Sequence, residues 1–371
     1  GDLVGLKAKV DDNYFSELGV NAIWITAPYE QIHGWVGGGS SGDFAHYGYH
    51  GYYALDFTAL DKNMGTVQEL RDFVDAAHNK NIRVVFDIVM NHAGYENLKD
   101  METYSFGSLK SGSYNWQPSS GETFHQWNDL KGETGWDNWW TSTWIRASFY
   151  GNAGSDDLTK CLDFSPDFKT ESTGGVGVPK LLETKWAQET SGYSDWINPS
   201  AASLRVNLNV APAEYLTKWL AAWVKEFGID GFRVDTAKHV DMYRWSALKT
   251  ACSTAYDEWR AANPVKAEKI PLPVGKTKGS FWMTGEVWGH GANKSNYHTD
   301  GNFDSVINFS FPKDGNLGSI GGTWSGYASS INSDPDFNVL SYISSHDQGL
   351  TRGNLKNLGT ALVLTPGGSQ I

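Results

Sequence analysis

The sequence predicts an α/β fold, namely a (β/α)8 barrel (TIM barrel) with an irregular inserted domain after its third strand. Short apolar runs rich in β-branched residues alternate with amphipathic helical stretches, which is typical of parallel strands joined by right-handed crossovers. Four of these runs end in an acidic residue, as strands do when their carboxyl ends form the active site of a barrel. One interval between consecutive strands is far too long for a single strand and helix, and it indicates the insertion.

The N-terminal part of the predicted barrel contains two strands with a helix between them. Residues 1–18 hold a loop and a helix, and the first predicted strand is Ala22–Ala27. The next helix has a capping box, in which Thr66 precedes Glu69 by three positions, and it continues with apolar residues at helical spacing. The β-branched run Ile82–Met90 is the next strand.

The C-terminal part of the predicted barrel opens with a helix between Pro212 and Gly228, which are typical start and stop residues. The strand Ile229–Asp235 follows directly. The later predicted strands are Phe281–Val287, Val306–Phe309, Val339–Ser344 and Ala361–Leu364. These elements supply seven strands, whereas a closed barrel pairs its first strand with its last. We therefore expect the first strand, the last helix and a further C-terminal domain to lie outside this sequence, which leaves one side of the sheet open.

A long insertion follows the strand Ile82–Met90, which is the third strand of the barrel when the missing first strand is counted. It separates this strand from the fourth, Ile229–Asp235. Asp87 and Asp235 are roughly 150 positions apart, whereas a barrel unit takes about 31 residues, so about 115 residues are extra. This stretch is rich in Gly, Ser, Asp and Trp, and its periodicity is poor. The sequence therefore predicts a catalytic barrel formed by residues 1–92 and 206–371, and an inserted domain formed by residues 93–205 over the active-site face.

Composition and charge exclude some classes of partner. The formal net charge is −12, which makes nucleic acids and anionic membrane surfaces poor partners. No apolar run approaches the roughly 18 residues that a membrane span requires. The 17 Trp, 17 Tyr and 17 Phe residues mostly indicate core, but flat aromatic faces also suit sugar rings. Two cysteines are too few for a disulfide scaffold. Cys252 is expected to be a buried thiol on a helix, and a disulfide between Cys252 and Cys161 is the alternative.

Four predicted strands end in a carboxylate, and this convergence is the main functional signal. The residues are Asp87 in FDIVMNH, Asp235 in GFRVD, Glu286 in MTGEVW and Asp347 in ISSHD. A single acid at a strand end is more often a helix N-cap than a catalyst. Four of them, three with a His or Arg nearby, favour convergence at the carboxyl ends of parallel strands.

Two carboxylates in different protonation states are the groups that glycoside hydrolysis uses. Arg233 lies on the same face of its strand as Asp235 and is expected to keep that carboxylate ionised as the nucleophile. Glu286 lies beside the apolar Val287 and Trp288, surroundings that favour a raised pKa and the role of general acid. The buried pair of charges in GFRVD is therefore interpreted as a nucleophile with its positioning cation.

The strand ends carry four longer motifs, which are FDIVMNH, GFRVDTAKH, GEVW and SSHD. They resemble the four signature regions of the α-amylase family of glycoside hydrolases, in the family's order, and the resemblance runs from Gly1 to Ile371. Within the family, the chain looks most similar to bacterial periplasmic α-amylases. The resemblance implies that Asp235 is the nucleophile, Glu286 the acid/base and Asp347 the stabiliser of the transition state.

The resemblance also implies which residues meet the substrate. Those that would contact the sugar in the cleavage subsite are Arg233, His92 and His346. Asp87 would support the site, and Lys238 and His239 would line the leaving-group side. In the motif YHGY, His50 would hydrogen-bond sugar hydroxyls and Tyr52 would stack on a sugar ring, although a lone Tyr more often packs in a core.

The family binds calcium where the inserted domain meets the barrel, and Ca2+ takes oxygen ligands from carboxylates, amides and backbone carbonyls. Asn91 matches the amide ligand, and His239 would contribute its carbonyl oxygen. Asp163 in CLDF would be a further ligand, in a motif that departs from the family's Leu-Pro-Asp-Leu at two positions. The alternatives to this aspartate are Asp156, Asp157 and Asp167. The alternative role for each of these aspartates is to hydrogen-bond the backbone of a local turn.

The resemblance implies an endo-acting, retaining enzyme that hydrolyses internal α-1,4-glucosidic bonds of starch-like glucans and maltodextrins. The pair Lys238 and His239 favours such substrates over short α-1,6 or sucrose-type ones. One alternative is a glucanotransferase that uses the same covalent intermediate, and another is a non-catalytic glucan-binding protein. We expect a monomer in the periplasm or outside the cell, on the strength of the resemblance, since the residues themselves show no signal-peptide pattern.

Overall fold

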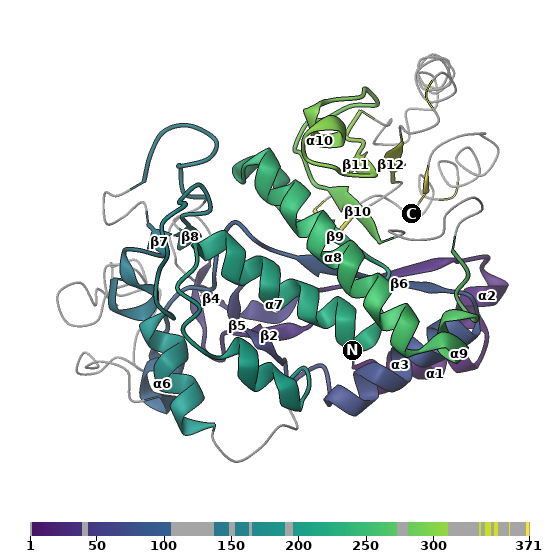
Figure 1. Ribbon diagram of the computed structural model, residues 1–371, viewed down its shortest axis with the longest axis horizontal. Helices are drawn as coiled ribbons and strands as arrows, with labels where there is room; N and C mark the ends of the chain where they lie inside the picture. Colours follow the sequence, from purple (N-terminus) through teal and green to yellow (C-terminus); the bar gives the residue numbers. More distant parts are fainter. Residues whose placement is uncertain are drawn as a thin grey trace.

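A curled parallel sheet with helices packed along its outer side forms the body of the molecule (Figure 1). The computed structural model describes residues 2–38, 44–104, 137–147, 153–162, 165–189, 196–272, 281–310, 334, 338–342, 345–347, 356 and 369–370. The sheet order is β1 (Ala22–Ile25), β6 (Arg83–Ile88), β9 (Gly231–Val234), β10 (Trp282–Gly285), β11 (Ser305–Ile307), β12 (Val339–Ser341) and β13 (Ser369–Gln370). All neighbouring pairs are parallel, and within the described residues no pairing joins β1 to β13. The predicted α/β barrel architecture is therefore confirmed.

Most observed strands of this sheet lie inside the predicted ones, and β11 begins one residue before its predicted start at Val306. Strand β9 ends at Val234, immediately before Asp235, and β10 ends at Gly285, immediately before Glu286. The two carboxylates thus follow their strands directly, at the same edge of the sheet. The predicted strand Ala361–Leu364 lies outside the described residues, and the seventh strand is β13, which the sequence analysis did not predict.

Helix α3 (Val67–Asn79) begins at the predicted capping box. The hydroxyl of Thr66 accepts a hydrogen bond from the backbone N–H of Glu69 at 3.2 Å, and the Glu69 carboxylate accepts one from the N–H of Thr66 at 2.7 Å. Together they satisfy two of the free donors at the helix N-terminus. The buried side of the helix is formed by Leu70, Phe73, Val74, Ala77 and His78. The prediction for this helix is correct.

Helix α7 (Pro212–Phe227) crosses the outer face of the sheet and ends at a glycine that no other residue can replace without strain. Gly228 has a φ of 71°, in the left-handed region that favours glycine. A Cβ at this position would lie 2.2 Å from Cε2 of Trp259, so the close packing of α7 against α8 (Met242–Ala262) also requires glycine. The start and stop that the sequence predicts for this helix are confirmed.

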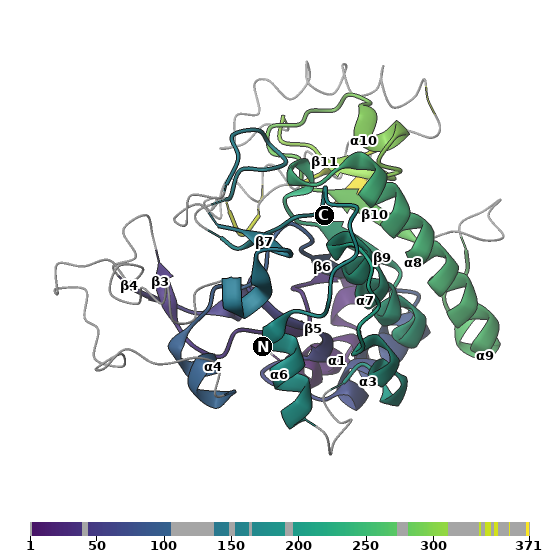
Figure 2. The same cartoon turned by 60° about the vertical axis from the view of Figure 1, so that its left-hand side comes forward.

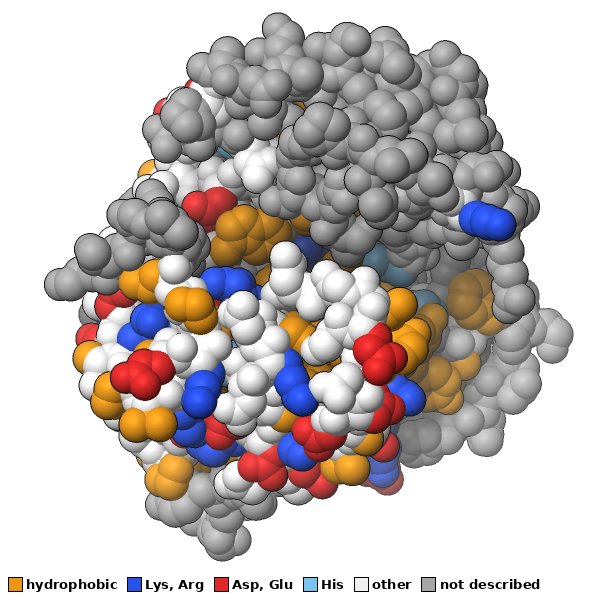
Figure 3. All heavy atoms as spheres, turned by 90° about the vertical axis from the view of Figure 1, so that its right-hand side faces the viewer, with side chains coloured by type: hydrophobic (Ala, Val, Ile, Leu, Met, Phe, Trp, Pro, Cys, Tyr) orange, Lys and Arg blue, Asp and Glu red, His pale blue; other side chains and the backbone are white. Residues whose placement is uncertain are grey.

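The remaining short helices complete the outer layer. They are α1 (Leu3–Asp11), α2 (Tyr14–Glu17), α9 (Pro264–Ala267) and α10 (Asn296–Thr299). On the face that carries α2 and α9, acidic and basic side chains are interspersed (Figure 3). Cys252 is a buried thiol on α8, as predicted, and neither it nor Cys161 forms a disulfide. No helix in the described ranges is both long and apolar enough to cross a membrane.

Two antiparallel strand pairs, of which the second is a hairpin, lie between β1 and α3 in the chain. One pairs β2 (Tyr29–Gln31) with β5 (Ala54–Leu60), which is buried along its whole length. The other pairs β3 (Val36–Gly38) with β4 (Phe44–His46). Figure 2 shows this hairpin projecting sideways from the body of the molecule. A 3₁₀-helix, Gly48–His50, connects it back to β5.

The described parts of residues 93–205 form mostly short elements and pack against the barrel helices. The elements are α4 (Leu98–Thr103), a π-helical turn (Asp137–Thr141), β7 (Ile145–Arg146), β8 (Asp167–Phe168), α6 (Lys180–Gln188) and a 3₁₀-helix (Pro199–Leu204). Trp144 stacks on Trp219 of α7, with ring centroids 5.9 Å apart and planes 3° apart. Trp140 packs edge-on against Phe168 in the same core. The hydrophobic core is therefore continuous from the sheet into this segment.

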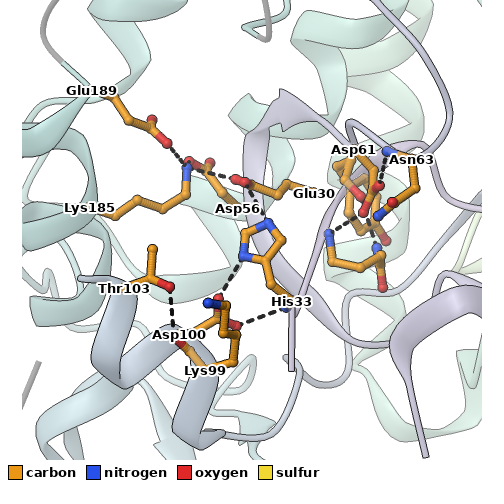
Figure 4. A network of polar contacts seen from close by, with 12 residues as sticks. Glu30, His33, Asp56, Asp61, Asn63, Lys99, Asp100, Thr103, Lys185 and Glu189 are labelled. Atoms are coloured by element: carbon orange, nitrogen blue, oxygen red, sulfur yellow. Dashed lines mark hydrogen bonds and ion pairs between the residues drawn. The ribbon is translucent and has the colours of Figure 1, made fainter. Parts of the chain in front are cut away.

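A buried charge network, here called the Lys185 network, connects the same segment to the paired strands β2 and β5 (Figure 4). The fully buried ammonium of Lys185 lies 2.6 Å from Glu30 Oε2, 3.0 Å from Asp56 Oδ2 and 2.6 Å from Glu189 Oε1. Its other members are Arg205, which pairs with Asp56 and Glu189, and His33, which pairs with Glu30 and Asp100. Such charges are tolerated inside a protein only when they are paired.

Candidate active site

Arg233 is the centre of the charged cluster at the carboxyl ends of the strands. It is 2 % exposed, and its Nη1 donates to Asp235 Oδ1 at 2.8 Å and to Asp87 Oδ1 at 3.0 Å. Its Nη2 lies 3.1 Å from Glu286 Oε1. Neighbouring strands cause this convergence, because Asp87 of β6 is in register with Arg233 of β9, which is in register with Thr284 of β10. The predicted shared face of Arg233 and Asp235 is confirmed.

One guanidinium therefore faces three carboxylates, and burial raises the pKa of two of them, Glu286 and Asp87. Burial raises the pKa of Glu286, an effect that the charge of Arg233 opposes and the neighbouring Asp235 carboxylate reinforces. Burial also raises the pKa of Asp87. The raised pKa of Glu286 agrees with the expectation from its apolar neighbours, although Trp288 is itself 63 % exposed. The arrangement can hold one carboxyl protonated beside one ionised carboxylate.

The backbone after β9 also holds Glu286 in place. Its Oε2 accepts a hydrogen bond from the N–H of Thr236 at 3.0 Å, and Thr236 itself has a left-handed φ of 47°. This is an uncommon conformation for a β-branched residue, and such strain is found mostly at functional sites. The turn thereby aims one backbone donor at the proposed acid.

A ladder of aromatic and imidazole rings flanks the cluster on the Asp87 side. The hydroxyl of Tyr52 donates to Asp87 Oδ2 at 3.0 Å and lies 3.0 Å from His346 Nε2. The Tyr52 ring stacks between His346, at 5.8 Å, and His50, at 5.3 Å. Burial lowers the pKa of His50 to about 4, so its imidazole is neutral near pH 7. Both predicted residues of YHGY thus lie beside the acidic cluster.

Residues 345–347, which follow β12, lie near β1 through a contact of His346 with Trp24. The ring of His346 packs edge-on against Trp24 of β1 at 5.9 Å. Trp24 in turn lies under the guanidinium of Arg233, with the ring centroid 5.1 Å from Cζ. Asp347 is half-exposed, and its carboxylate lies 3.5 Å from His346 Nε2. Asp347 is therefore connected to the cluster through His346.

On the opposite side, the residues after β9 meet the segment 153–160. The ammonium of Lys238 lies 3.0 Å from Asp157 Oδ2, and Nδ1 of His239 lies 2.7 Å from the carbonyl oxygen of Asp157. His92 is buried, and burial lowers its pKa to about 4. Lys238 and His239, the predicted contacts of the leaving-group side, thus meet the segment 153–160, whereas His92 hydrogen-bonds the backbone of Tyr52.

The proposed calcium ligands are only partly within the described residues. Asn91 Nδ2 donates to Asp167 Oδ2 at 3.1 Å, and Ser165 donates to the other oxygen of this buried carboxylate at 2.6 Å. Burial raises the pKa of Asp167 to about 7. Asp163 lies outside the described residues. Among the residues that are described, no three His, Cys, Asp or Glu side chains gather as metal ligands, but an amide beside a buried carboxylate offers the oxygen atoms that Ca2+ prefers.

Three contacts of the site were not predicted from the sequence. Trp24, which lies under Arg233, was visible only as a strand residue in AIWITA. The N–H of Thr236 and the carbonyl oxygen of Asp157 are backbone groups, and a residue pattern does not reveal which backbone group faces a site. Of these three, only Trp24 could have been found, from its place near the end of the first strand.

A known family model matches most of the chain. The model, described as "Alpha amylase, catalytic domain", matches residues 1–171 and 186–325. This chain belongs to the alpha-amylase family. The resemblance that the motifs indicate is therefore confirmed, and the family is one of glycoside hydrolases.

Individual relatives point the same way. The chain is 46 % identical to a periplasmic alpha-amylase of Escherichia coli (strain K12), and the match covers 100 % of the chain but 54 % of that protein. It is 29 % identical to a cyclomaltodextrin glucanotransferase of Bacillus sp. (strain 17-1), over 72 % of the chain and 30 % of that protein. A crystal structure of an alpha-amylase from Geobacillus thermoleovorans, complexed with acarbose, matches with a TM-score of 0.58 at 19 % identity and covers all of the chain and 63 % of that structure. This last likeness concerns the fold.

Proposed function

We propose that this alpha-amylase-family protein is an endo-acting, retaining glycoside hydrolase that cleaves internal α-1,4-glucosidic bonds of starch-like glucans and maltodextrins. The observation that carries the proposal is the single guanidinium of Arg233, which joins Asp235 and Glu286 through its two terminal nitrogens. A retaining mechanism needs two carboxyl groups at short separation, one ionised and one protonated. A guanidinium that contacts both carboxylates supports this requirement, because it holds them beside one another.

The proposed chemistry assigns one role to each carboxylate. Asp235, ion-paired with Arg233, attacks the anomeric carbon while Glu286, whose pKa burial raises, gives its proton to the departing oxygen. Glu286 then takes a proton from the water that releases the covalently bound sugar. Asp347 and the neutral imidazoles of His92 and His50 would bind sugar hydroxyls.

A glucanotransferase is the second candidate, because it uses the same covalent intermediate and the chain also resembles a cyclomaltodextrin glucanotransferase. The two differ only in whether water or another sugar accepts the bound glycosyl group. A non-catalytic glucan-binding protein has less support, since binding alone does not require Arg233 to be surrounded by three carboxylates.

We also propose the division into a barrel, residues 1–92 and 206–371, and an inserted domain, residues 93–205. Calcium would bind between them through Asn91, the carbonyl oxygen of His239 and an aspartate, for which Asp163 or the buried Asp167 is the candidate. A periplasmic or extracellular monomer acting on α-glucans is the proposed setting, in line with the periplasmic relative and with a net charge of −12, which disfavours nucleic acids and anionic membranes.

The test is a time course of products from maltoheptaose, measured with and without glucose as an acceptor. Hydrolysis predicts shorter maltodextrins of α configuration in both cases, whereas transfer predicts longer products that depend on the acceptor. The Asp235→Asn variant should form neither. Asp11→Asn, an exposed substitution in α1, is the matched control and should behave like the wild type. Release of β-configured products would contradict the retaining mechanism.

A further inference from the structure

A buried aspartate lies directly before strand β9, at the opposite end of the strand from Asp235. Asp230 is 3 % exposed, and its carboxylate accepts three hydrogen bonds. The donors are the backbone N–H of Val84 in β6 at 2.8 Å, Nε2 of His78 in α3 at 2.8 Å and the hydroxyl of Tyr256 in α8 at 2.7 Å. Such donors satisfy a carboxylate that burial removes from water. Asp230 therefore connects β9 to β6 and to two helices of the outer layer.

Two of the bonds of Asp230 go to one residue of the neighbouring strand. Its backbone N–H donates to the carbonyl oxygen of Val84 at 3.0 Å, while its side chain accepts from the N–H of Val84. The bonds of a parallel ladder repeat along the strands, so they would form equally well after a shift by two residues, which also keeps every side chain on its face. Strand β9 is buried at every position, so apolar burial does not distinguish these registers either. The carboxylate of Asp230 meets the N–H of Val84 in one register only.

The register set at Asp230 decides where Arg233 lies. Val84 and Asp87 are three residues apart on β6, and Asp230 and Arg233 are three residues apart on β9, which is roughly 10 Å along each strand. The same register therefore places Asp87 beside Arg233, whose Nη1 donates to Asp87 Oδ1 at 3.0 Å. Because Asp230 and Arg233 belong to one short segment, a displacement of Asp230 along β9 displaces Arg233 as well.

The same arrangement occurs a second time in the sheet. Asp304 lies directly before β11, and its N–H donates to the carbonyl oxygen of Met283 in β10 at 2.9 Å. Its carboxylate accepts from the N–H of Met283 at 2.7 Å and is held by Lys249 of α8, seven positions before Tyr256. One side of α8 thus holds both aspartates. Of the two, Asp230 is the one that joins two strands carrying residues of the charged cluster.

We propose that Asp230 is a positioning residue, which sets the register of β9 against β6 and thereby places Arg233 and Asp235. It does not touch the reacting atoms and acts through Arg233, whose guanidinium must meet Asp87 on the neighbouring strand. This inference rests on the proposed function, because the groups that it places are the proposed nucleophile and its cation.

Two substitutions of Asp230 test this role. Asp230→Ala leaves the N–H of Val84 without its acceptor, so β9 is no longer held to β6 by a side chain at this end. A misplacement of about 1 Å can cost about a hundredfold in rate, so we expect kcat on maltoheptaose to fall about ten- to a hundredfold. Asp230→Asn keeps an oxygen for Val84 and offers its NH2 group to the hydroxyl of Tyr256, so it should keep most of kcat.

The pH profile of kcat/KM is the readout that a merely structural role would not change. Burial raises the pKa of Asp87 to about 7, an effect that the charge of Arg233 opposes, the Asp235 carboxylate reinforces and the hydroxyl of Tyr52 opposes. If Arg233 moves about 1 Å away, the pKa of Asp87 should rise, because less positive charge stabilises its ionised form. The acid limb of the profile is then expected to move to higher pH by about 0.5 to 1 in Asp230→Ala, at an effective dielectric constant of roughly 20.

Asp100→Ala is the matched control, because it removes a buried carboxylate with similar partners outside the parallel sheet. Asp100 accepts from the N–H of His33 at 2.9 Å, from Nδ2 of Asn97 at 2.8 Å and pairs with the ring of His33. It should lower Tm without moving the acid limb. If Asp230→Ala does not fold, Tyr256→Phe takes its place, since it removes one donor to Asp230 and should move the limb in the same direction by less.

The outcomes separate this inference from the proposed function. An acid limb that stays in place in Asp230→Ala, or in Tyr256→Phe where the alanine variant does not fold, overturns the inference and leaves the proposed function intact. So does an equal movement in Asp100→Ala. If the wild type cleaves or transfers no glucan, the proposed function fails, and crystal structures of the variants decide the inference. A longer distance from Arg233 Nη1 to Asp87 Oδ1 in the variant used, but not in Asp100→Ala, then supports it, and an unchanged distance overturns it.

Discussion

Replacing Lys185 by methionine is expected to reduce the free energy of unfolding by about 3 to 5 kcal/mol, the range for breaking a buried ion pair from one side. The ammonium of Lys185 is within 3.0 Å of Glu30 and Asp56, and both of these carboxylates are almost completely buried. Glu189, the third partner, is 28 % exposed at its side chain and can regain water. The magnitude therefore comes from two carboxylates that stay buried with less opposing charge.

Thermal unfolding followed by circular dichroism measures this loss. With an unfolding entropy of roughly 2.1 cal/mol/K per residue over 371 residues, the expected fall in Tm is about 4 to 6 °C. The matched control is Lys225→Met, because Lys225 forms an exposed pair with Glu258 at 2.8 Å. An exposed pair contributes about 0 to 1 kcal/mol, so the control should lose about 1 °C or less.

A second substitution tests the cause of the loss. If uncompensated negative charge destabilises Lys185→Met, then adding Asp56→Asn should recover part of the Tm, because it removes one of the buried charges. Equal Tm values for Lys185→Met and Lys225→Met would refute the reasoning. So would a double variant that is less stable than the sum of the two single changes predicts.

Three further outcomes are expected. Asp235→Asn should lower turnover at least about a thousandfold without lowering Tm, because it removes the covalent route rather than packing; retention of a tenth of the activity would exclude Asp235 as nucleophile. Exhaustive chelation should lower Tm if calcium binds beside Asn91, since a ligand of the folded state stabilises it by mass action; an unchanged Tm in a chelator series would count against the site. Burial lowers the pKa of His33, but its bonds to Asp100 and Glu30 prevail and raise it to about 10. His33→Gln should therefore cost most stability below about pH 6.5 and progressively less as pH rises toward 10, which Tm measured across this range would check.

Local patterns predicted the elements whose determinants are adjacent in the sequence. The capping box of Thr66 and Glu69 and the stop at Gly228 are examples, because each depends on a few neighbouring residues. The cluster of Asp87, Arg233 and Asp235 was also predictable, because parallel strands bring their carboxyl ends to one edge.

Interactions between distant segments were not predictable in this way. Lys185 lies in an amphipathic helix, where a lysine is usually on the solvated side. Its partners Glu30 and Asp56 come from the paired strands β2 and β5, far earlier in the chain. The exposed rings of Phe44, Tyr47 and Tyr49 were likewise seen only as part of a high aromatic content, because exposure depends on where the hairpin of β3 and β4 points. Both features depend on tertiary packing, which overrides local propensity.

The order of strands in the sheet follows the order in which the ribosome makes them. Within this sheet, each strand from β6 to β12 pairs with the sheet strand that precedes it in the chain. The sheet can therefore grow at one edge during synthesis without threading. The longest interval between the synthesis of two neighbouring strands falls between β6 and β9. Residues 89–230 are made in this interval, which takes about 7 to 30 s at roughly 5 to 20 residues per second. During that time Arg233 has not been made, so Asp87 lacks its ion-pair partner, and the apolar strand β6 has one unpaired edge. The nascent chain is therefore expected to be most vulnerable to aggregation at this stage, which protease digestion of chains stalled before and after residue 234 would show.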